Sequence, residues 1–283
     1  MMGVMTASES AHRGLGVTAG LDAGLARELA NRCEQLGYQS LWSNDEPAAG
    51  GLDTLAEFAA ATQKIQLGVG VLPLHRYQPA EIAGEVERLG IDPARLWLGI
   101  GSGELSPQID VLRRAVAELR TLLPETTRVV VAAMRPRLCR LGGAIADGVL
   151  LNWMPPGQAA EARQWVREAA VKHGRTAPVV ASYVRVAVGP KASLRLREEE
   201  GFYRNINEGH RKHFAAMDVP VGSVGIAAPQ RSDVVDALAP YHSALDLPIV
   251  RVLADADPDS LNSVVDAAAP QWERGGSRSP RGG

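Results

Sequence analysis

Short apolar runs alternate with amphipathic helical patterns along most of this chain. Eight such runs can be counted, at residues 15–21, 38–45, from 65, from 95, 128–134, 148–153, 178–189 and 249–254. A helical pattern follows each run. Because a short loop cannot reverse a strand within one sheet, the strands must be parallel and joined by right-handed crossovers. Eight strand–helix units predict an α/β fold, a closed (β/α)8 TIM barrel in preference to an open doubly wound sheet.

Two of the predicted strands lose side-chain bulk where they end. Residues 65–79 read IQLGVGVLPLHRYQP, and residues 95–104 read RLWLGIGSGE. Glycine weakens a strand, so it usually marks a bulge or a place where the backbone approaches a ligand closely. Two such strand ends, joined by a helix, predict a cofactor that lies flat across the mouth of the barrel.

Length and charge bound the remaining possibilities. A chain of 283 residues with a net charge of −2 fits one barrel domain, expected at residues 14–273, and gives no sign of a nucleic-acid partner. The polar, glycine-rich ends, residues 1–13 and 274–283, are expected to be disordered tails. The two cysteines lack metal-ligand spacing, and no run reaches the roughly 18 apolar residues of a membrane span. We therefore expect a soluble cytoplasmic protein without a metal.

The active site of such a barrel lies at the C-terminal ends of its strands. This rule selects polar and small residues after strands two to six, namely residues 44–46, 70–77, 102–104, 133–137 and 152–154. Some have a structural alternative. Asp45 and Glu46 precede Pro47 and could cap a turn. Pro136 suits a helix start for structural reasons, although the free amides there would also bind an anion.

Several familiar motifs are absent or weak. The GIGSG stretch is not a dinucleotide fingerprint, because Glu104 stands where the third glycine is needed. His210 and His213 with Glu208 lack a further ligand, so they are interpreted as a solvated helix face. His75 could form a surface pair with Arg76 or line the mouth. There is no GxSxG, HExxH or P-loop sequence, which leaves hydrolysis and phosphoryl transfer with little support. A glycine-lined mouth instead suits a cofactor that performs the chemistry itself.

At these residues the chain resembles the bacterial luciferase-like superfamily, and within it the deazaflavin (coenzyme F420)-dependent oxidoreductases. The likeness is greatest to the F420-dependent glucose-6-phosphate dehydrogenases. It runs from about residue 15 to residue 158 and rests on GYQSLWSND, LGVGVLPLHRYQPAEIA, RLWLGIGSGE and VVVAAMRPRLCRLGGAIADG. Each segment is weak alone, and together they are specific. The resemblance implies a luciferase-like TIM barrel.

The resemblance also implies roles for individual residues. It assigns cofactor contacts to Asp45, Gly70, Val71, Ser102, Gly103, Ala133, Met134, Arg135 and Pro136. Gly70 and Val71 match a bulge behind the central ring of the cofactor, often with a non-prolyl cis peptide. Glu104 matches an acid that transfers a proton, and the turn at residues 133–136 matches the one that holds the tail and phosphate of the cofactor. A homodimer is implied as well.

Three departures from the sugar-phosphate enzymes matter. Glu46 replaces their catalytic histidine, so Glu46 and Glu104 are the candidate catalytic residues. Trp153 and Met154 replace polar residues and a lysine, which predicts an apolar substrate rim, with His75 beside it and no cation for a phosphate. Residues 105–131 form a shorter segment than is usual in the family, which predicts a more open site.

Three functions remain open. The leading hypothesis is hydride transfer between the deazaflavin F420 and a small apolar or quinone-like substrate, with Glu104 or Glu46 moving the proton. The second keeps the fold but uses FMN, as a luciferase-like monooxygenase. The third is a non-catalytic F420-binding protein, which the short segment after Glu104 favours, because the missing loop normally helps to close the site.

Overall fold

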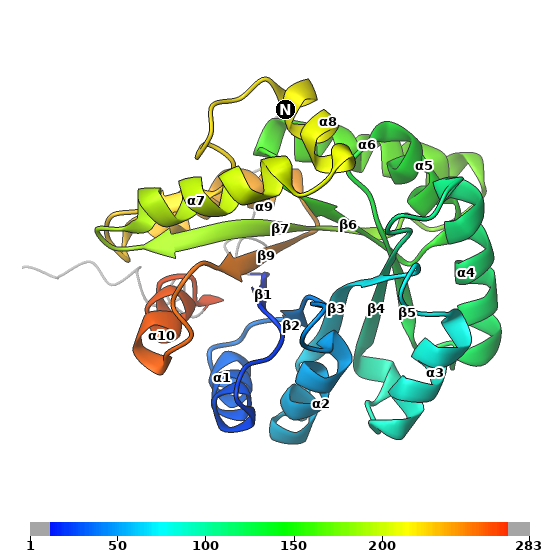
Figure 1. The fold of residues 1–283 in the computed structure, drawn as a ribbon, viewed down its shortest axis with the longest axis horizontal. Helices are drawn as coiled ribbons and strands as arrows, with labels where there is room; N and C mark the ends of the chain where they lie inside the picture. Colours follow the sequence, from blue (N-terminus) through cyan, green and yellow to red (C-terminus); the bar gives the residue numbers. More distant parts are fainter. Residues whose placement is uncertain (1–11, 271–283) are drawn as a thin grey trace, which may run out of the picture.

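Parallel strands close into a barrel in the computed structural model, which describes residues 12–270 (Figure 1). The eight barrel strands are β1 (Gly14–Val17), β2 (Ser40–Ser43), β3 (Gln66–Pro73), β4 (Leu96–Gly101), β5 (Arg128–Ala132), β6 (Gly148–Asn152), β7 (Val179–Val188) and β9 (Leu247–Val252). Strands β1 to β6 pair in chain order, β7 lies between β6 and β9, and β9 pairs with β1 to complete the ring. The predicted TIM barrel and its eight strands are confirmed.

A further short strand, β8 (Ile226–Ala228), departs from the expected pattern. It pairs with the end of β7 at Val186–Val188, beyond the point at Tyr183 where β7 leaves β6. The sequence does not predict it, because three residues are too few to show a period. The consequence is that β7 extends well past its neighbour β6 at the mouth of the barrel.

Helices surround the strands and follow the predicted order. They are α1 (Ala23–Gln35), α2 (Gly51–Ala61), α3 (Pro79–Arg88), α4 (Gln108–Leu122), α5 (Pro136–Ile145), α6 (Pro156–Lys172), α7 (Ala192–Asn205), α8 (Glu208–Met217), α9 (Asp233–Ala244) and α10 (Pro258–Ala267), with the short 3-10 helix η1 (Pro93–Arg95) before β4. Local sequence fixes several starts. Asp22 caps α1 through its side chain, and Gln78 forms a capping box with Glu81 at α3.

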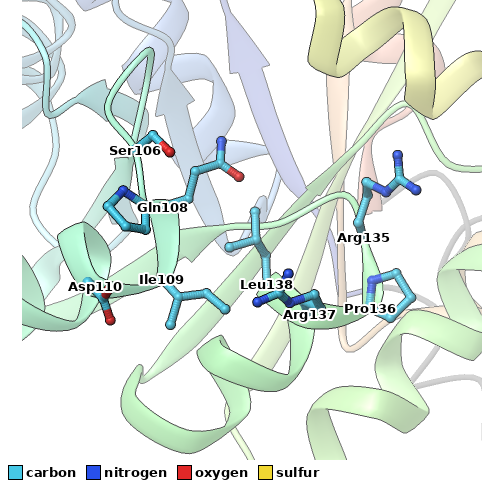
Figure 2. A pocket seen from close by; sticks show the side chains of 9 residues that line it. Ser106, Gln108, Ile109, Asp110, Arg135, Pro136, Arg137 and Leu138 are labelled. Carbon is cyan, nitrogen blue, oxygen red and sulfur yellow. The ribbon is translucent and has the colours of Figure 1, made fainter.

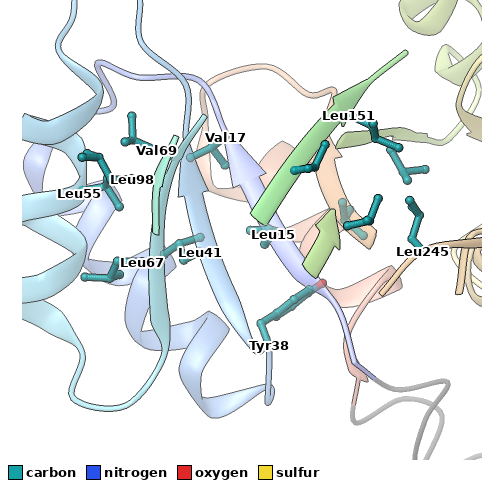
Figure 3. Packing of buried hydrophobic residues seen from close by; sticks show 14 of the residues in the cluster. Leu15, Val17, Tyr38, Leu41, Leu55, Leu67, Val69, Leu98, Leu151 and Leu245 are labelled. Carbon is teal, nitrogen blue, oxygen red and sulfur yellow. The ribbon is translucent and has the colours of Figure 1, made fainter. Parts of the chain in front are cut away.

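Apolar side chains form two layers. The larger cluster lies between the strands and the helices and includes Leu15, Leu41 and Leu67 (Figure 3). The smaller one draws on β2, β4, β5, β6, β7 and β9, so it fills the barrel interior around Trp42 and Trp97, whose rings lie 6.2 Å apart. Gly68 makes room for Trp42, because a Cβ at that position would overlap the indole.

The chain ends lie mostly outside the described residues. Of the expected tails, residues 1–11 and 274–283 are not described, nor are residues 271–273 of the expected barrel domain. Arg13, the last residue of the expected N-terminal tail, is fully buried and donates a hydrogen bond from Nη1 to the carbonyl oxygen of Ala268 at 3.2 Å. Among the helices of residues 12–270, none is long and apolar enough to cross a bilayer.

Candidate functional site at the barrel mouth

The end of β3 carries the expected bulge. The pairing of β3 with β4 shifts register between Val69 and Leu72, and the Gly70–Val71 peptide bond is cis. A Cβ on Gly70 would lie 2.6 Å from the hydroxyl oxygen of Tyr183, so any larger residue would force that side chain to shift. The Tyr183 hydroxyl donates a hydrogen bond to the carbonyl oxygen of Gly70 at 3.2 Å. The bulge is therefore held from the opposite wall of the barrel.

The loop after β4 packs against the loop after β3. Gly103 has a φ of +58°, and a Cβ on it would overlap the ring of His75. Ser102 is buried, whereas His75 and Glu104 are exposed. His75 thus lies beside the Gly103 loop at the mouth. Within the described chain Glu104 forms no ion pair or hydrogen bond through its carboxylate, which leaves that group open to solvent and to a ligand.

The carboxylate of Asp45 points into the protein. Its side chain is fully buried, forms an ion pair with Arg76, and accepts hydrogen bonds from the Tyr77 hydroxyl at 3.2 Å and from the Gly51 amide at 3.0 Å. Burial and the adjacent Asp45 raise the pKa of Tyr77. In this arrangement Asp45 ties the β2 and β3 loops to the start of α2.

Glu46 lies on the side of the mouth formed by β1 and β2. Its Oε1 accepts a hydrogen bond from Asn44 Nδ2, while Asn44 Oδ1 accepts one from the Ala19 amide at 3.0 Å. The backbones of Glu46 and Ala49 exchange two hydrogen bonds, which closes a tight loop. Glu46 is half-buried and held by this loop, and the two candidate carboxylates lie on loops of different strands.

A cavity of about 680 Å³ opens beside the mouth, between the first turns of α4 and α5 (Figure 2). It is lined by Ser106, Pro107, Gln108, Ile109, Asp110, Arg135, Pro136, Arg137 and Leu138. Arg135 and Pro136 of the predicted tail-binding turn therefore line it. Ala133 and Met134 lie just before it, the first buried and the second half-buried. Arg137 was among the residues selected after strand five, whereas Gln108 was not predicted.

Trp153 and Met154 are buried, so they do not form an exposed rim. Helix α8 covers Trp153, which packs against Phe214 with ring centroids 5.6 Å apart. The His213 Nε2–H donates to the carbonyl oxygen of Trp153 at 2.8 Å. The expectation of a solvated face at His213 is wrong, because this histidine is buried and its pKa is lowered by desolvation. In the described part of the chain no cluster of His, Cys, Asp and Glu could hold a metal ion.

Two buried arginines were missed by the sequence reading. Arg185 on β7 and Arg251 on β9 are 2% and 5% exposed, and they are direct neighbours in the strand pairing. Arg185 Nη1 donates to Asn152 Oδ1, and Arg251 Nη2 donates to Thr18 Oγ1 at 2.9 Å. The expectation that the mouth lacks a cation near strand six is therefore wrong. The available signal was a charged residue inside each of two otherwise apolar strands.

Comparison with protein families assigns this barrel. The model of the family described as luciferase-like monooxygenase matches residues 2–130 and 112–232, which is most of the chain. The chain belongs to this family. The luciferase-like barrel with its β3 bulge is thus the expected fold, and the resemblance found in the sequence is confirmed.

Individual relatives of this luciferase-like protein differ in what they do. The 4-hydroxyprotoasukamycin monooxygenase of Streptomyces nodosus subsp. asukaensis is 30% identical over 41% of this chain, and the match spans only 33% of that protein. An F420-dependent secondary alcohol dehydrogenase, solved with an F420–acetone adduct, superposes with a TM-score of 0.71 at 17% identity, covering 90% of this chain and 97% of that one.

A second solved structure binds a different group. The oxygenating constituent of 3,6-diketocamphane monooxygenase from Pseudomonas putida, in complex with FMN, superposes with a TM-score of 0.62 at 15% identity, covering 92% of this chain and 98% of that one. At these identities the two structures support the shared fold alone.

Proposed function

We propose that this protein is a coenzyme F420-dependent oxidoreductase that transfers a hydride between the deazaflavin and a small organic substrate with an apolar or quinone-like body. The observation that carries the proposal is the cavity of about 680 Å³ that adjoins the mouth and is flanked by Arg135 and Arg137. F420 has a flat ring system and a long tail with several negative charges. The mouth and the adjoining cavity offer a place for each.

The residues present fit such a group. At the mouth, Gly70 and Gly103 carry no side chain that would fill the space over the bulge and the β4 loop. In the cavity, Arg135 and Arg137 are exposed and flank the first turn of α5, whose free amides favour an anion. Two guanidinium groups beside a helix N-terminus suit a tail with more than one negative charge.

Each part of the site has a distinct task in this proposal. When bound, the deazaflavin supplies the hydride-carrying ring. The Gly70–Val71 bulge, which Tyr183 fixes through its hydrogen bond to the Gly70 carbonyl oxygen, would hold that ring. Arg135 and Arg137 bind the tail, and Glu104 exchanges a proton with the substrate at its carboxylate oxygens. Glu46, half-buried beside Asn44, is the second candidate for that proton.

FMN is the competing cofactor, because the P. putida structure binds it on the same fold. FMN ends in a single phosphate, whereas the cavity is lined from Arg135 on one side to Asp110 on the other. This extent favours the longer F420 tail. A homodimer, which the resemblance implies, is also expected, and sedimentation of the purified protein would test it.

A fluorescence titration of the purified protein with F420, beside one with FMN, tests the proposal. We expect saturation by F420 and none by FMN, and an Arg135→Gln/Arg137→Gln double variant should weaken F420 binding by about tenfold or more. Arg27→Gln, on the surface of α1, is the matched control and should bind as the parent does. Saturation by FMN alone would move the protein to the flavin monooxygenases. F420 binding without turnover on any acceptor would indicate a non-catalytic F420-binding protein.

A further inference from the structure

Arg185 and Arg251 place two positive charges side by side in the barrel mouth. Their Cα atoms face each other in the parallel pairing of β7 with β9, where neighbouring strands lie about 4.8 Å apart. Both guanidinium carbons lie close to the ring of Tyr183, at 5.9 Å and 6.0 Å from its centroid. The two charges therefore lie on the same side of the sheet near Tyr183, with the Arg185 guanidinium bonded toward β6 at Asn152 and that of Arg251 bonded toward the end of β1 at Thr18.

No carboxylate in the described chain forms an ion pair with either arginine. Their hydrogen-bond partners are the neutral side chains of Asn152 and Thr18. Arg185 Nε and Arg251 Nη1 are buried and have no partner. Buried charges are normally paired, because an unpaired charge away from water is costly. Two adjacent, unneutralised arginines are thus an unusual arrangement for a merely structural purpose.

Aromatic stacking accounts for only part of this arrangement. The guanidinium of Arg185 lies 3.8 Å from the ring centroid of Trp153 and 5.1 Å from that of Tyr203. These contacts hold its faces but leave the edge that carries Nε unpaired. Desolvation lowers the pKa of Arg185 to about 10, and Arg251 contributes to the shift by repulsion. The orientation of Arg185 is fixed in advance, and Glu199 acts on its charge from a distance without forming an ion pair with it.

A second cavity, of about 370 Å³, connects Arg251 with the outside. Its lining includes Thr18, Arg251, Glu198, Glu199, Phe202 and Leu253. A further arginine on its wall, Arg195, is already paired with Asp255 at 2.5 Å. Among the residues of this lining, Arg251 is the cation left for an incoming anion, and Phe202 and Leu253 offer apolar contact beside it.

We propose that Arg251, which lines this cavity, binds a carboxylate group of the substrate, and that Arg185 on the neighbouring strand adds its positive charge from behind. A guanidinium presents a planar fork of N–H donors that matches the two oxygens of a carboxylate. The substrate role rests on the proposed function. Tyr183 contacts both this pair and the Gly70 carbonyl oxygen. The anion would therefore lie on the opposite side of the Tyr183 side chain from the β3 bulge. The preferred substrates are then apolar acids.

Isothermal titration with benzoate, and with the uncharged benzamide, tests the pair on the full chain without any cofactor. We expect benzoate to bind and benzamide to bind at least tenfold more weakly. Arg251→Gln should weaken benzoate binding by about tenfold or more, and Arg185→Gln, which removes only the supporting charge, by a few fold. Arg251→Lys keeps the charge but loses the fork, so it should lose most of the same affinity. Arg251→Lys also serves as a second variant in case a glutamine variant does not fold. A melting curve of each variant shows whether it is folded.

Glu199 supplies an independent variant of opposite sign. It lines the cavity and acts on Arg185 electrostatically without forming an ion pair with it. Glu199→Gln removes a competing negative charge, so it should tighten benzoate binding by a few fold, whereas a purely structural arginine pair predicts no change. Arg27→Gln, on the surface of α1, is the matched control and should bind benzoate as the parent does.

The F420 titration separates this proposal from the proposed function. If Arg251→Gln abolished F420 binding and left benzoate binding intact, the pair would bind the pyrimidine oxygens of the cofactor, and the substrate proposal would be overturned. Equal affinity of the parent for benzoate and benzamide would overturn it too. If the parent protein instead bound benzoate through this pair and failed to bind F420, that result would support the anion site and overturn only the proposed cofactor.

Discussion

The hydroxyl of Tyr183 on β7 donates a hydrogen bond across the barrel to the carbonyl oxygen of Gly70 on β3, at 3.2 Å. The same ring lies edge-on to Trp42, at 6.5 Å between centroids, and contacts the Arg185 and Arg251 guanidinium groups. Burial raises the pKa of Tyr183, so it stays a neutral donor at any working pH. One side chain therefore joins the bulge, the aromatic floor and the cation pair.

Tyr183→Phe should keep the fold and loosen the bulge. Removing the hydroxyl leaves the Gly70 carbonyl without this donor, which costs about 1 kcal/mol of unfolding free energy. We expect a few-fold weaker F420 binding, measured by fluorescence titration, with the strand content of the parent by circular dichroism. An unchanged affinity would mean that the hydrogen bond plays no part in positioning the ring.

Asp45→Asn tests whether Asp45 acts within the protein or on the cofactor. The buried carboxylate pairs with Arg76 and accepts from Tyr77 and Gly51, so its neutralisation should lower the unfolding free energy by about 2 kcal/mol in urea. Asp53→Asn, in an exposed pair with Arg88, is the control and should cost less than about 0.5 kcal/mol. A loss of F420 affinity with full stability would instead support the direct contact that the family resemblance implies.

Glu200→Gln should destabilise the contact between α7 and the loop before β8. Glu200 is fully buried, pairs with Arg204 at 2.7 Å and accepts from the amides of Gly222 and Val224, both at 3.0 Å. Loss of the charge should cost about 2 kcal/mol and speed hydrogen exchange at those two amides. Glu208→Gln, whose pair with Lys212 is exposed, is the matched control. Equal effects of the two variants would contradict this role.

Acid should destabilise the protein through buried histidines. Burial lowers the pKa of His242 to about 4, with help from Arg13, whereas in the unfolded chain it is about 6.5. Between these pH values His242 is protonated in the unfolded chain and neutral in the folded one. The free energy of unfolding therefore falls as the pH drops from about 6.5 to 4. His210, also at about 4, and His213 act in the same direction.

His242→Gln should flatten this pH dependence. The variant removes one contributing group, which is worth up to about 3 kcal/mol across the range. Urea unfolding at pH 7 and pH 5 measures the effect. The stability difference between the two pH values should shrink in the variant, and an unchanged difference would show that His242 takes up its proton equally well in the folded state.

The strands of the barrel were predictable because each is an apolar run long enough to show its period. The β3 bulge was predictable as well, from the glycines in LGVGV. Strand β8 was not, since its three residues show no pattern. Trp153 and Met154 follow β6, where a rim residue belongs, but α8 folds over them, and a packing contact between segments so distant in sequence leaves no local signal.

The arginine pair was missed for a different reason. Active-site residues of a barrel are expected after its strands, whereas Arg185 and Arg251 lie inside them, in VVASYVRVAV and LPIVRV. A charged residue in a run that is otherwise buried on both faces points into the barrel or onto a helix, and in either case needs a partner. Asp45 was selected from its position after a strand, but its partner Arg76 could not be predicted. The ion pair depends on how the β2 and β3 loops pack in the folded protein.

Two like charges held on adjacent strands repel each other in every folded molecule. An anion bound to Arg251 beside Arg185 relieves this repulsion only in the native state, so it acts as a folding ligand. By mass action, a ligand at a hundred times its dissociation constant adds about 2.7 kcal/mol to the native state. The melting temperature of this protein should therefore depend on the buffer, and aromatic carboxylate salts should protect it from heat where chloride at equal ionic strength does not.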